Sequence, residues 1–269
     1  MGQQQGSGTP VSRYREAMQR KPAPVGMLVE GDSWFAFPMI LRTNIVSELK
    51  SEFGSQIAQL DLSGNGDEAR EMLCGAQYGR LFKTLARERL VFDGILFSGG
   101  GNDIVGDNLP SLLNRFEPGM TWEDCLRLGR FNRRLQQIES AYRDLADLRE
   151  DHQPGAWVFT HSYDYAIPSG RGVRILGLSV ASGWVKEVMD SFAIPPSLQR
   201  TLLDQMLARF DDLMLKLEQE LPRWRHVRTQ GTLSEADWED ELHPTTPGFR
   251  KVAARFSAAL RETFPERLP

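Results

Sequence analysis

The sequence is poor in cysteine, in histidine and in long apolar runs. It has two cysteines and four histidines among 269 residues. Two cysteines do not make a disulfide framework in a chain of this length, so we expect a reducing compartment, the cytoplasm. No apolar run approaches the ~20 residues that a membrane span needs, so we expect no transmembrane segment. The few histidines include no close pair, so we expect neither a metal nor a cofactor.

The chain also lacks an excess of positive charge. Its 32 lysines and arginines are outnumbered by 36 aspartates and glutamates, which leaves a formal net charge of -4. The basic residues are scattered, and no basic stripe alternates with aromatic residues. We therefore expect no nucleic-acid partner.

The domain organisation follows from composition. Residues 1–10 are rich in Gln, Gly and Ser and have no apolar core, so they do not resemble a secretory signal. We expect a flexible leader over 1–21, in which residues 11–21 are weakly helical. No Pro-, Gly- or Ser-rich linker divides the remainder, so 22–269 is expected to form a single domain, with an insertion or cap at 171–221.

Short apolar segments alternate with segments of helical periodicity along the whole chain. This alternation predicts a three-layer α/β/α, flavodoxin-like fold with a central parallel sheet of about five strands. The expected strands are 25–30, 56–62, 94–98, 156–160 and 226–229. Helices are expected over 44–53, from about 68, from a start signal at 121–124, over 203–221 and over 249–260, with a loop at 107–119.

Three Gly-rich turns end three successive expected strands, and they contain Ser33, Gly66 and Asn102. The carboxyl ends of parallel strands lie along one edge of a sheet, where ligands bind in such folds. Near the C-terminus, Asp240 and His243 are three residues apart, so both side chains can face the same way. An aspartate so placed can orient and stabilise a histidine base.

These segments resemble the GDSL family of serine hydrolases, also called SGNH hydrolases. The family's blocks occur in order as Gly31-Asp32-Ser33-Trp34, Gly64-Asn65-Gly66-Asp67, Gly101-Asn102-Asp103 and Asp240-Glu241-Leu242-His243-Pro244. Trp34 stands where the family name has leucine. The resemblance implies the SGNH hydrolase fold. It also implies a serine-dependent ester hydrolase that acts through an acyl-enzyme on a small-molecule or lipid ester, with short acyl groups expected.

The resemblance also assigns roles to residues. Ser33 would be the nucleophile, His243 its general base and Asp240 the third member of the triad. The oxyanion hole would consist of the backbone N–H groups of Ser33 and Gly66 and the side-chain amide of Asn102, with Gly64 left as the alternative to Gly66. These roles suit the chemistry, because a serine needs a base to become nucleophilic and the tetrahedral intermediate needs fixed N–H donors.

Five further residues are candidates for substrate contacts. Trp34 and Phe37 lie beside Ser33 in sequence and would line an acyl pocket or belong to the core. His161 and Asp164 follow the fourth expected strand, where a structural role is the favoured alternative. Trp184 falls in the 171–221 segment and would belong to the cap.

Other functions use the same residues or fail on single positions. A thioesterase or an acyltransferase would use the same triad, and a ligand-binding module without catalysis could share the fold. The turn at 98–103 has two of the glycines of a dinucleotide-binding turn, but Ile104 stands at the third position. Ser33 is not in a Gly-x-Ser-x-Gly elbow, because Phe35 occupies the position of the second glycine.

Overall fold

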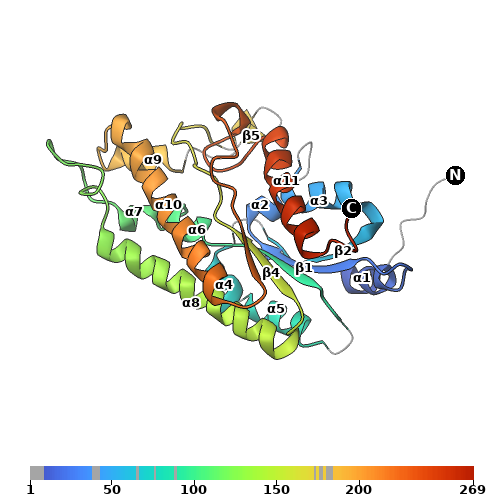
Figure 1. The fold of residues 1–269 in the computed structure, drawn as a ribbon. Helices are drawn as coiled ribbons and strands as arrows, with labels where there is room; N and C mark the ends of the chain where they lie inside the picture. The colour runs from blue at the N-terminus through green and yellow to red at the C-terminus, as the bar shows by residue number, and fades with distance from the viewer. Residues whose placement is uncertain are drawn as a thin grey trace.

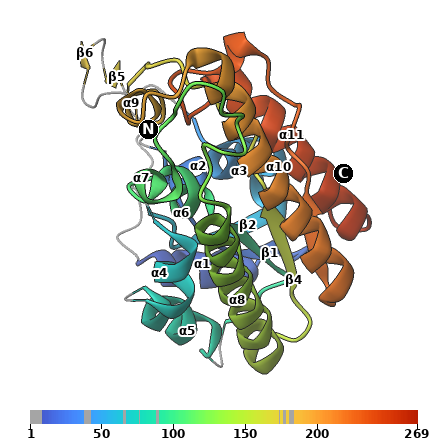
Figure 2. The ribbon, with the colours of Figure 1, turned by 90° about the vertical axis from the view of Figure 1, so that its left-hand side faces the viewer.

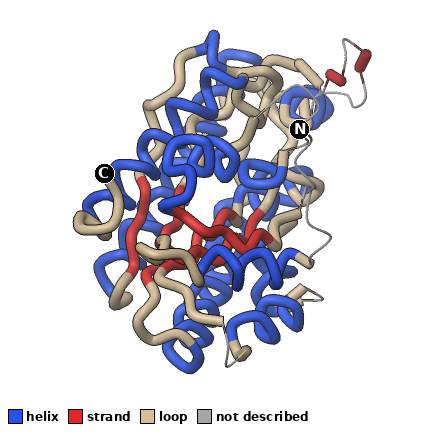
Figure 3. The backbone as a smooth tube through the Cα atoms, turned by 90° about the vertical axis from the view of Figure 1, so that its right-hand side faces the viewer, coloured by secondary structure: helices blue, strands red, loops and turns tan. Residues whose placement is uncertain are grey.

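The computed structural model describes residues 9–37, 43–64, 67–75, 77–87, 90–172, 174–175, 178–179 and 184–269. Five parallel strands form a central sheet in the order β2-β1-β3-β4-β7. Helices lie on both faces of this sheet (Figure 3). The predicted three-layer α/β/α fold with a parallel sheet is therefore confirmed. The strands are β1 (Val25–Gly31), β2 (Ile57–Asp61), β3 (Gly94–Ser98), β4 (Trp157–His161) and β7 (Trp224–Val227).

Two groups of helices form the outer layers (Figure 1). Helices α3 (Ile45–Phe53) and α11 (Thr246–Thr263) pack together over one face of the sheet. The opposite face carries the long helices α8 (Leu128–His152) and α10 (Pro196–Glu220), which run side by side in Figures 1 and 2. Shorter helices complete the layers, namely α2 (Ser33–Ala36), α4 (Ala69–Cys74), α5 (Tyr78–Leu85), α6 (Gly101–Val105), α7 (Leu109–Leu112) and α9 (Lys186–Ser191).

The core lies at the central strands. Every residue of β1 and β3 is buried, as expected for parallel strands covered on both faces. β1 pairs with β2 on one side and with β3 on the other, in a register that sets Gly31 beside Ser98. The two candidate turns that follow β1 and β3 therefore leave the sheet as neighbours.

The N-terminal segment differs from the expected leader. Residues Pro10–Met18 form helix α1, which packs against the edge strand β2. The side chain of Tyr14 is only 3% exposed, and its hydroxyl donates a hydrogen bond of 2.6 Å to the carbonyl of Val91. The flexible leader expected over 1–21 thus does not extend through residues 10–18. The buried side chain of Tyr14 anchors α1 to the core.

Two other elements differ from expectation. Residues 121–124, expected to start a helix, form a turn instead. In this turn the Asp124 carboxylate accepts the backbone N–H of Thr121 at 2.8 Å and the hydroxyl of Thr121 at 2.9 Å. Helix α8 begins later, at Leu128, and the loop expected at 107–119 contains α7. These capping bonds are local, so the residues that make them do not determine whether a helix follows.

The segment expected as a cap has two parts. Helix α10 packs on β4, β7 and α8 and is an ordinary layer of the sandwich. The residues before it include the antiparallel pair β5 (Arg174–Ile175) and β6 (Leu178–Ser179), outside the main sheet, and helix α9. Among the described residues before α10, only the β5–β6 pair is an excursion from the layers, whereas α9 packs against α7. None of the helices in the described ranges is long and apolar enough to cross a membrane.

Candidate active site

The structure brings Ser33, His243 and Asp240 together. Ser33 is the first residue of α2, directly after β1, and its Oγ lies 2.8 Å from Nε2 of His243. Nδ1 of His243 lies 3.0 Å from each carboxylate oxygen of Asp240. Asp240 also accepts the backbone N–H of Leu242 at 2.9 Å and that of His243 at 2.8 Å. The carboxylate therefore fixes the loop and orients the imidazole, with Nδ1–H toward Asp240 and Nε2 free to accept from Ser33.

A second buried carboxylate, Asp32, holds the start of α2. Its Oδ1 accepts the backbone N–H of Trp34 at 3.0 Å and the hydroxyl of Ser98 at 2.8 Å, and its Oδ2 accepts the hydroxyl of Tyr163. Burial raises the pKa of Asp32 to about 6, and the hydrogen bonds from Tyr163, Trp34 and Ser98 oppose this rise. The network ties α2 to β3 and to the segment after β4. It thereby fixes the backbone that carries Ser33.

His161 is part of this network and is fully buried. Its Nδ1 accepts the backbone N–H of Tyr163 at 3.2 Å, so Nε2 carries the hydrogen and donates it to Ser98 Oγ at 2.8 Å. Burial lowers the pKa of His161 to about 3, so the ring is neutral at ordinary pH. Both ring nitrogens are occupied, which favours the structural alternative over substrate contact.

Asp164 lines the cavity beside Ser33, but its oxygens serve the backbone. Oδ1 accepts the N–H groups of Tyr165 and Gly231, and Oδ2 accepts that of Leu233, all at 2.7 Å. Asp164 thus anchors the loop that leads from β7 toward Asp240. This arrangement also favours a structural role.

Three aromatic candidates lie against the triad. Trp34 lines the cavity, and its indole N–H donates to the carbonyl of Leu242 at 3.0 Å. The ring of Phe37 lies 4.6 Å from that of His243, and the half-buried ring of Trp184 approaches it edge-on at 6.0 Å. Trp34 thus holds the loop that carries His243, and the rings of Phe37 and Trp184 lie beside the imidazole.

Asn102 lies at the carboxyl edge of the sheet, in the first turn of α6. Its side-chain NH2 donates to the carbonyl of Asp67 at 3.0 Å. A carbonyl can only accept, which fixes the orientation of the amide and leaves its second N–H available. Asn102 also lines the cavity that contains Ser33 and His243.

The turn before Asn102 depends on two glycines. Gly100 has φ of 101°, which favours glycine, and a Cβ on Gly101 would lie 2.8 Å from the Tyr163 ring. Asp103 then accepts the backbone N–H of Ala69 at 2.8 Å and joins α6 to α4. Burial raises the pKa of Asp103, because its charge is removed from water.

The second glycine block is described only in part. Gly66 lies outside the described residues. The backbone N–H of Gly64 donates to the carbonyl of Gly31 at 2.9 Å. Because that N–H is occupied, the structure disfavours Gly64 as the alternative oxyanion donor.

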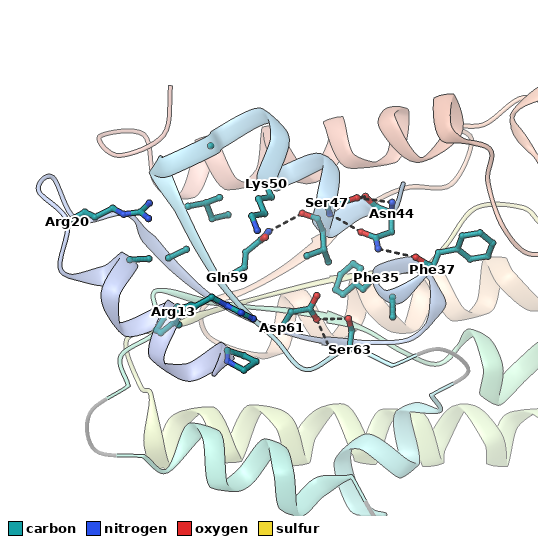
Figure 4. Close-up of a pocket in the computed structure, with 18 residues that line it drawn as sticks. Arg13, Arg20, Phe35, Phe37, Asn44, Ser47, Lys50, Gln59, Asp61 and Ser63 are labelled. Atoms are coloured by element: carbon teal, nitrogen blue, oxygen red, sulfur yellow. Dashed lines mark hydrogen bonds between the residues drawn. The ribbon is translucent and has the colours of Figure 1, made fainter. Parts of the chain in front are cut away.

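The cavity at the triad is small. It measures about 30 Å³ and is lined by Ser33, Asn102 and His243 among others. A larger groove of about 700 Å³ lies between α1, β2 and α3 (Figure 4). Phe37 lines this groove too, but Ser33, Asn102 and His243 do not. Among the described residues, no three His, Cys, Asp or Glu side chains form a group that could hold a metal ion.

Sequence analysis missed the supporting roles of Asp32, Ser98 and Tyr163. Asp32 stands in the first block, directly before Ser33, and that position was the available signal. Ser98 ends β3 and Tyr163 follows β4, so only the strand order reveals that both meet Asp32.

Comparisons with known proteins bear on the fold. No protein-family model matches the sequence, and no curated protein matches it either. Solved structures do match. A lipase from a goat rumen metagenome superposes with a TM-score of 0.56 at 15% identity, covering 87% of this chain and 97% of its own. A protein described as a GDSL-like lipase, from Parabacteroides merdae, gives 0.54 at 16% identity, covering 87% and 94%. One described as an SGNH hydrolase, from Slackia heliotrinireducens, gives 0.53 at 11%, covering 88% and 99%.

The chain has the SGNH hydrolase fold. At these identities the likeness establishes the fold alone. In this SGNH-type fold, the residues of the first, third and last sequence blocks converge at the carboxyl edge of the sheet.

Proposed function

We propose that this protein is a serine-dependent hydrolase of carboxylic esters that works through an acyl-enzyme. The observation that carries the proposal is the unbroken series of hydrogen bonds from Asp240 through His243 to Ser33, at 3.0 and 2.8 Å. A serine hydroxyl that donates to an aspartate-oriented imidazole is the arrangement that activates it as a nucleophile.

The reaction would proceed in two halves. Ser33 Oγ attacks the ester carbonyl carbon while its proton passes to His243 Nε2, and Asp240 stabilises the resulting imidazolium. His243 then gives this proton to the leaving alcohol oxygen, and the acyl-enzyme forms. A water molecule, deprotonated by His243, attacks the acyl carbon, and the carboxylic acid leaves as Ser33 regains its proton.

The developing oxyanion needs donors that are fixed before the reaction. The free N–H of the Asn102 amide supports its role, because the amide is already held by its bond to Asp67. We assign the backbone N–H groups of Ser33 and Gly66 as the other donors, in line with the family resemblance.

The substrate class follows from the size of the cavity. The cavity beside Ser33 in the described part of the chain measures about 30 Å³, which supports a small acyl group over a long one. We therefore propose esters with short acyl groups on a small molecule.

Hydrolysis of p-nitrophenyl esters from acetate to palmitate tests the proposal. We expect wild-type activity that is highest with short chains, and none with Ser33→Ala, whose circular dichroism and melting temperature should stay close to those of wild type. A fluorophosphonate probe should label wild type and not the variant. Wild-type rates in Ser33→Ala, or a wild type that neither hydrolyses esters nor reacts with the probe, would refute the mechanism.

A further inference from the structure

Glu241 lies between the triad aspartate and the triad histidine in sequence, and the proposed chemistry does not use it. Its side chain is fully buried. The carboxylate accepts three backbone N–H groups, from Gly170 at 2.9 Å, Val185 at 2.8 Å and Lys186 at 3.0 Å. Charge-assisted bonds of this kind are stronger than bonds between neutral groups. Glu241 is therefore a strong junction between three parts of the chain.

The same residue also binds through its backbone. The N–H of Glu241 donates to the carbonyl of Arg171 at 3.3 Å. Gly170 and Arg171 precede the excursion outside the main sheet, while Val185 and Lys186 follow it. Both ends of this excursion are thus attached to one residue of the catalytic loop.

Trp184 directly precedes one of these attachment points. Val185 is fully buried, so the backbone beside Trp184 is fixed on its C-terminal side. The indole ring is half-buried and approaches the imidazole of His243 edge-on at 6.0 Å. The position of the ring beside the base therefore depends on the bonds that Glu241 makes.

We propose that Glu241 is a positioning residue that holds Trp184 as one wall of the substrate site beside His243. This inference rests on the proposed ester hydrolysis. The side-chain bonds of Glu241 go to Gly170, Val185 and Lys186 and not to Ser33 or the His243 ring. Its effect on the fit of the substrate is therefore exerted through Trp184.

A glutamine at this position separates charge and geometry from volume. Glu241→Gln keeps the size of the side chain, but its NH2 group cannot accept from a backbone N–H. At least one of the three bonds is then replaced by two donors that face each other. A misplacement of about 1 Å can cost about 100-fold in rate, so we expect a loss in kcat/KM of about tenfold or more.

The test measures kcat and KM over the p-nitrophenyl ester series for wild type, Glu241→Gln, Trp184→Ala and the double variant. We expect both single variants to change the preference for acyl length in the same direction, mainly through KM. The kcat/KM of the double variant should be no lower than that of the less active single variant, because both changes disturb the same wall of the site.

Asp93→Asn is the matched control. Asp93 accepts the backbone N–H of Gly26 at 2.7 Å and pairs with Arg267, at the amino ends of the strands and away from Ser33. The Asp93→Asn variant should have a lower melting temperature than wild type and the same preference for acyl length.

Three results would overturn the inference. The first is a Glu241→Gln variant with the kcat/KM values of wild type. The second is a Glu241→Gln variant whose kcat/KM falls by the same factor for every ester, in proportion to a lower melting temperature. The third is a double variant whose loss in kcat/KM equals the product of the losses of the two single variants. Wild type that neither hydrolyses any ester nor reacts with the fluorophosphonate probe would overturn the proposed function and this inference together. Active wild type with an unchanged variant would overturn this inference alone.

Discussion

Two carboxylates near Ser33 have different tasks. Asp240 orients His243, whereas Asp32 accepts from the backbone of α2, from Ser98 and from Tyr163 and never contacts the base directly. In the proposed mechanism, Asp240 acts on the proton held by His243, and Asp32 acts on the position of Ser33. Substitutions of single residues at this site should therefore have different effects on kcat, on KM and on stability.

Asn102→Ala should lower kcat about 100- to 1,000-fold with little change in KM, since the lost donor acts on the oxyanion and less on the bound ester. Steady-state kinetics on the best p-nitrophenyl ester measures this. Asn114→Ala is the control, because that amide donates to the carbonyl of Asp124, accepts from Arg127 and does not line the cavity at Ser33. A fall in kcat below about tenfold for Asn102→Ala would exclude its oxyanion role.

Glu30 provides a prediction about stability and pH. Its side chain is fully buried in β1, Oε1 lies 3.2 Å from Arg80, and Oε2 has no hydrogen-bond partner among the described residues. Burial raises its pKa from 4.5 to about 8, opposed by Arg80. The folded protein keeps this proton up to about pH 8, while the unfolded chain releases it near 4.5, so stability falls as pH rises through that window.

Glu30→Gln should remove this part of the pH dependence. We expect wild type and variant to unfold at similar urea concentrations at pH 5, and the variant to be more stable at pH 8.5 by about 1–4 kcal/mol, at about 1.4 kcal/mol per pKa unit. Urea denaturation at the two pH values measures the difference. Parallel stability profiles would show that Glu30 is ionised in the folded protein at pH 5.

At the scale of the elements, α1 contributes more to the packing of the sheet than its sequence indicates. It covers the outer side of the edge strand β2, and the Tyr14 hydroxyl reaches the carbonyl of Val91. A Cβ on Gly26 would lie 2.3 Å from that hydroxyl, so β1 has a glycine where the helix approaches the sheet.

Tyr14→Ala should reduce the free energy of unfolding by about 3–5 kcal/mol, as for other large aromatic side chains lost from a core. Tyr14→Phe should cost only about 1 kcal/mol, for the hydrogen bond. Denaturant titration gives both values. Equal stability of all three proteins would mean that residues 10–18 are the leader that the sequence suggested.

The sequence predicted the strands to within about two residues, because buried parallel strands are continuous apolar runs bounded by turns. The shared edge of the strand ends predicted that Ser33 and Asn102 would lie close together, and the family resemblance added Asp240 and His243; the structure brings the four to one cavity or its hydrogen bonds. The sequence did not predict the start of α8, the packing of α1, or the network of Asp32, Ser98 and Tyr163. Those features depend on contacts between distant segments, and no local pattern encodes them.

On the scale of the whole molecule, the two ends of the strands have separate tasks. The carboxyl ends carry the proposed active site, while the amino ends are tied to the C-terminus through Arg267, which bonds to Asp93 and to the carbonyl of Pro24. Leu268 is buried beside it, at 3% exposure.

Removal of residues 267–269 should therefore lower stability by about 2 kcal/mol, mostly from the loss of Leu268 burial, and leave kcat and KM unchanged. Calorimetry and ester kinetics on the shortened chain measure the two effects. A changed KM would show that the two ends of the sheet are coupled.

The pair Ser33 and His243 spans 210 positions of the sequence. A ribosome that adds about 5–20 residues per second adds His243 about 10–40 s after it adds Ser33. Throughout that interval the nascent chain holds a serine with no partner to activate it. On the proposed mechanism, hydrolytic activity therefore begins only with the last elements of the chain, and a chain stalled before residue 243 lacks the proposed base.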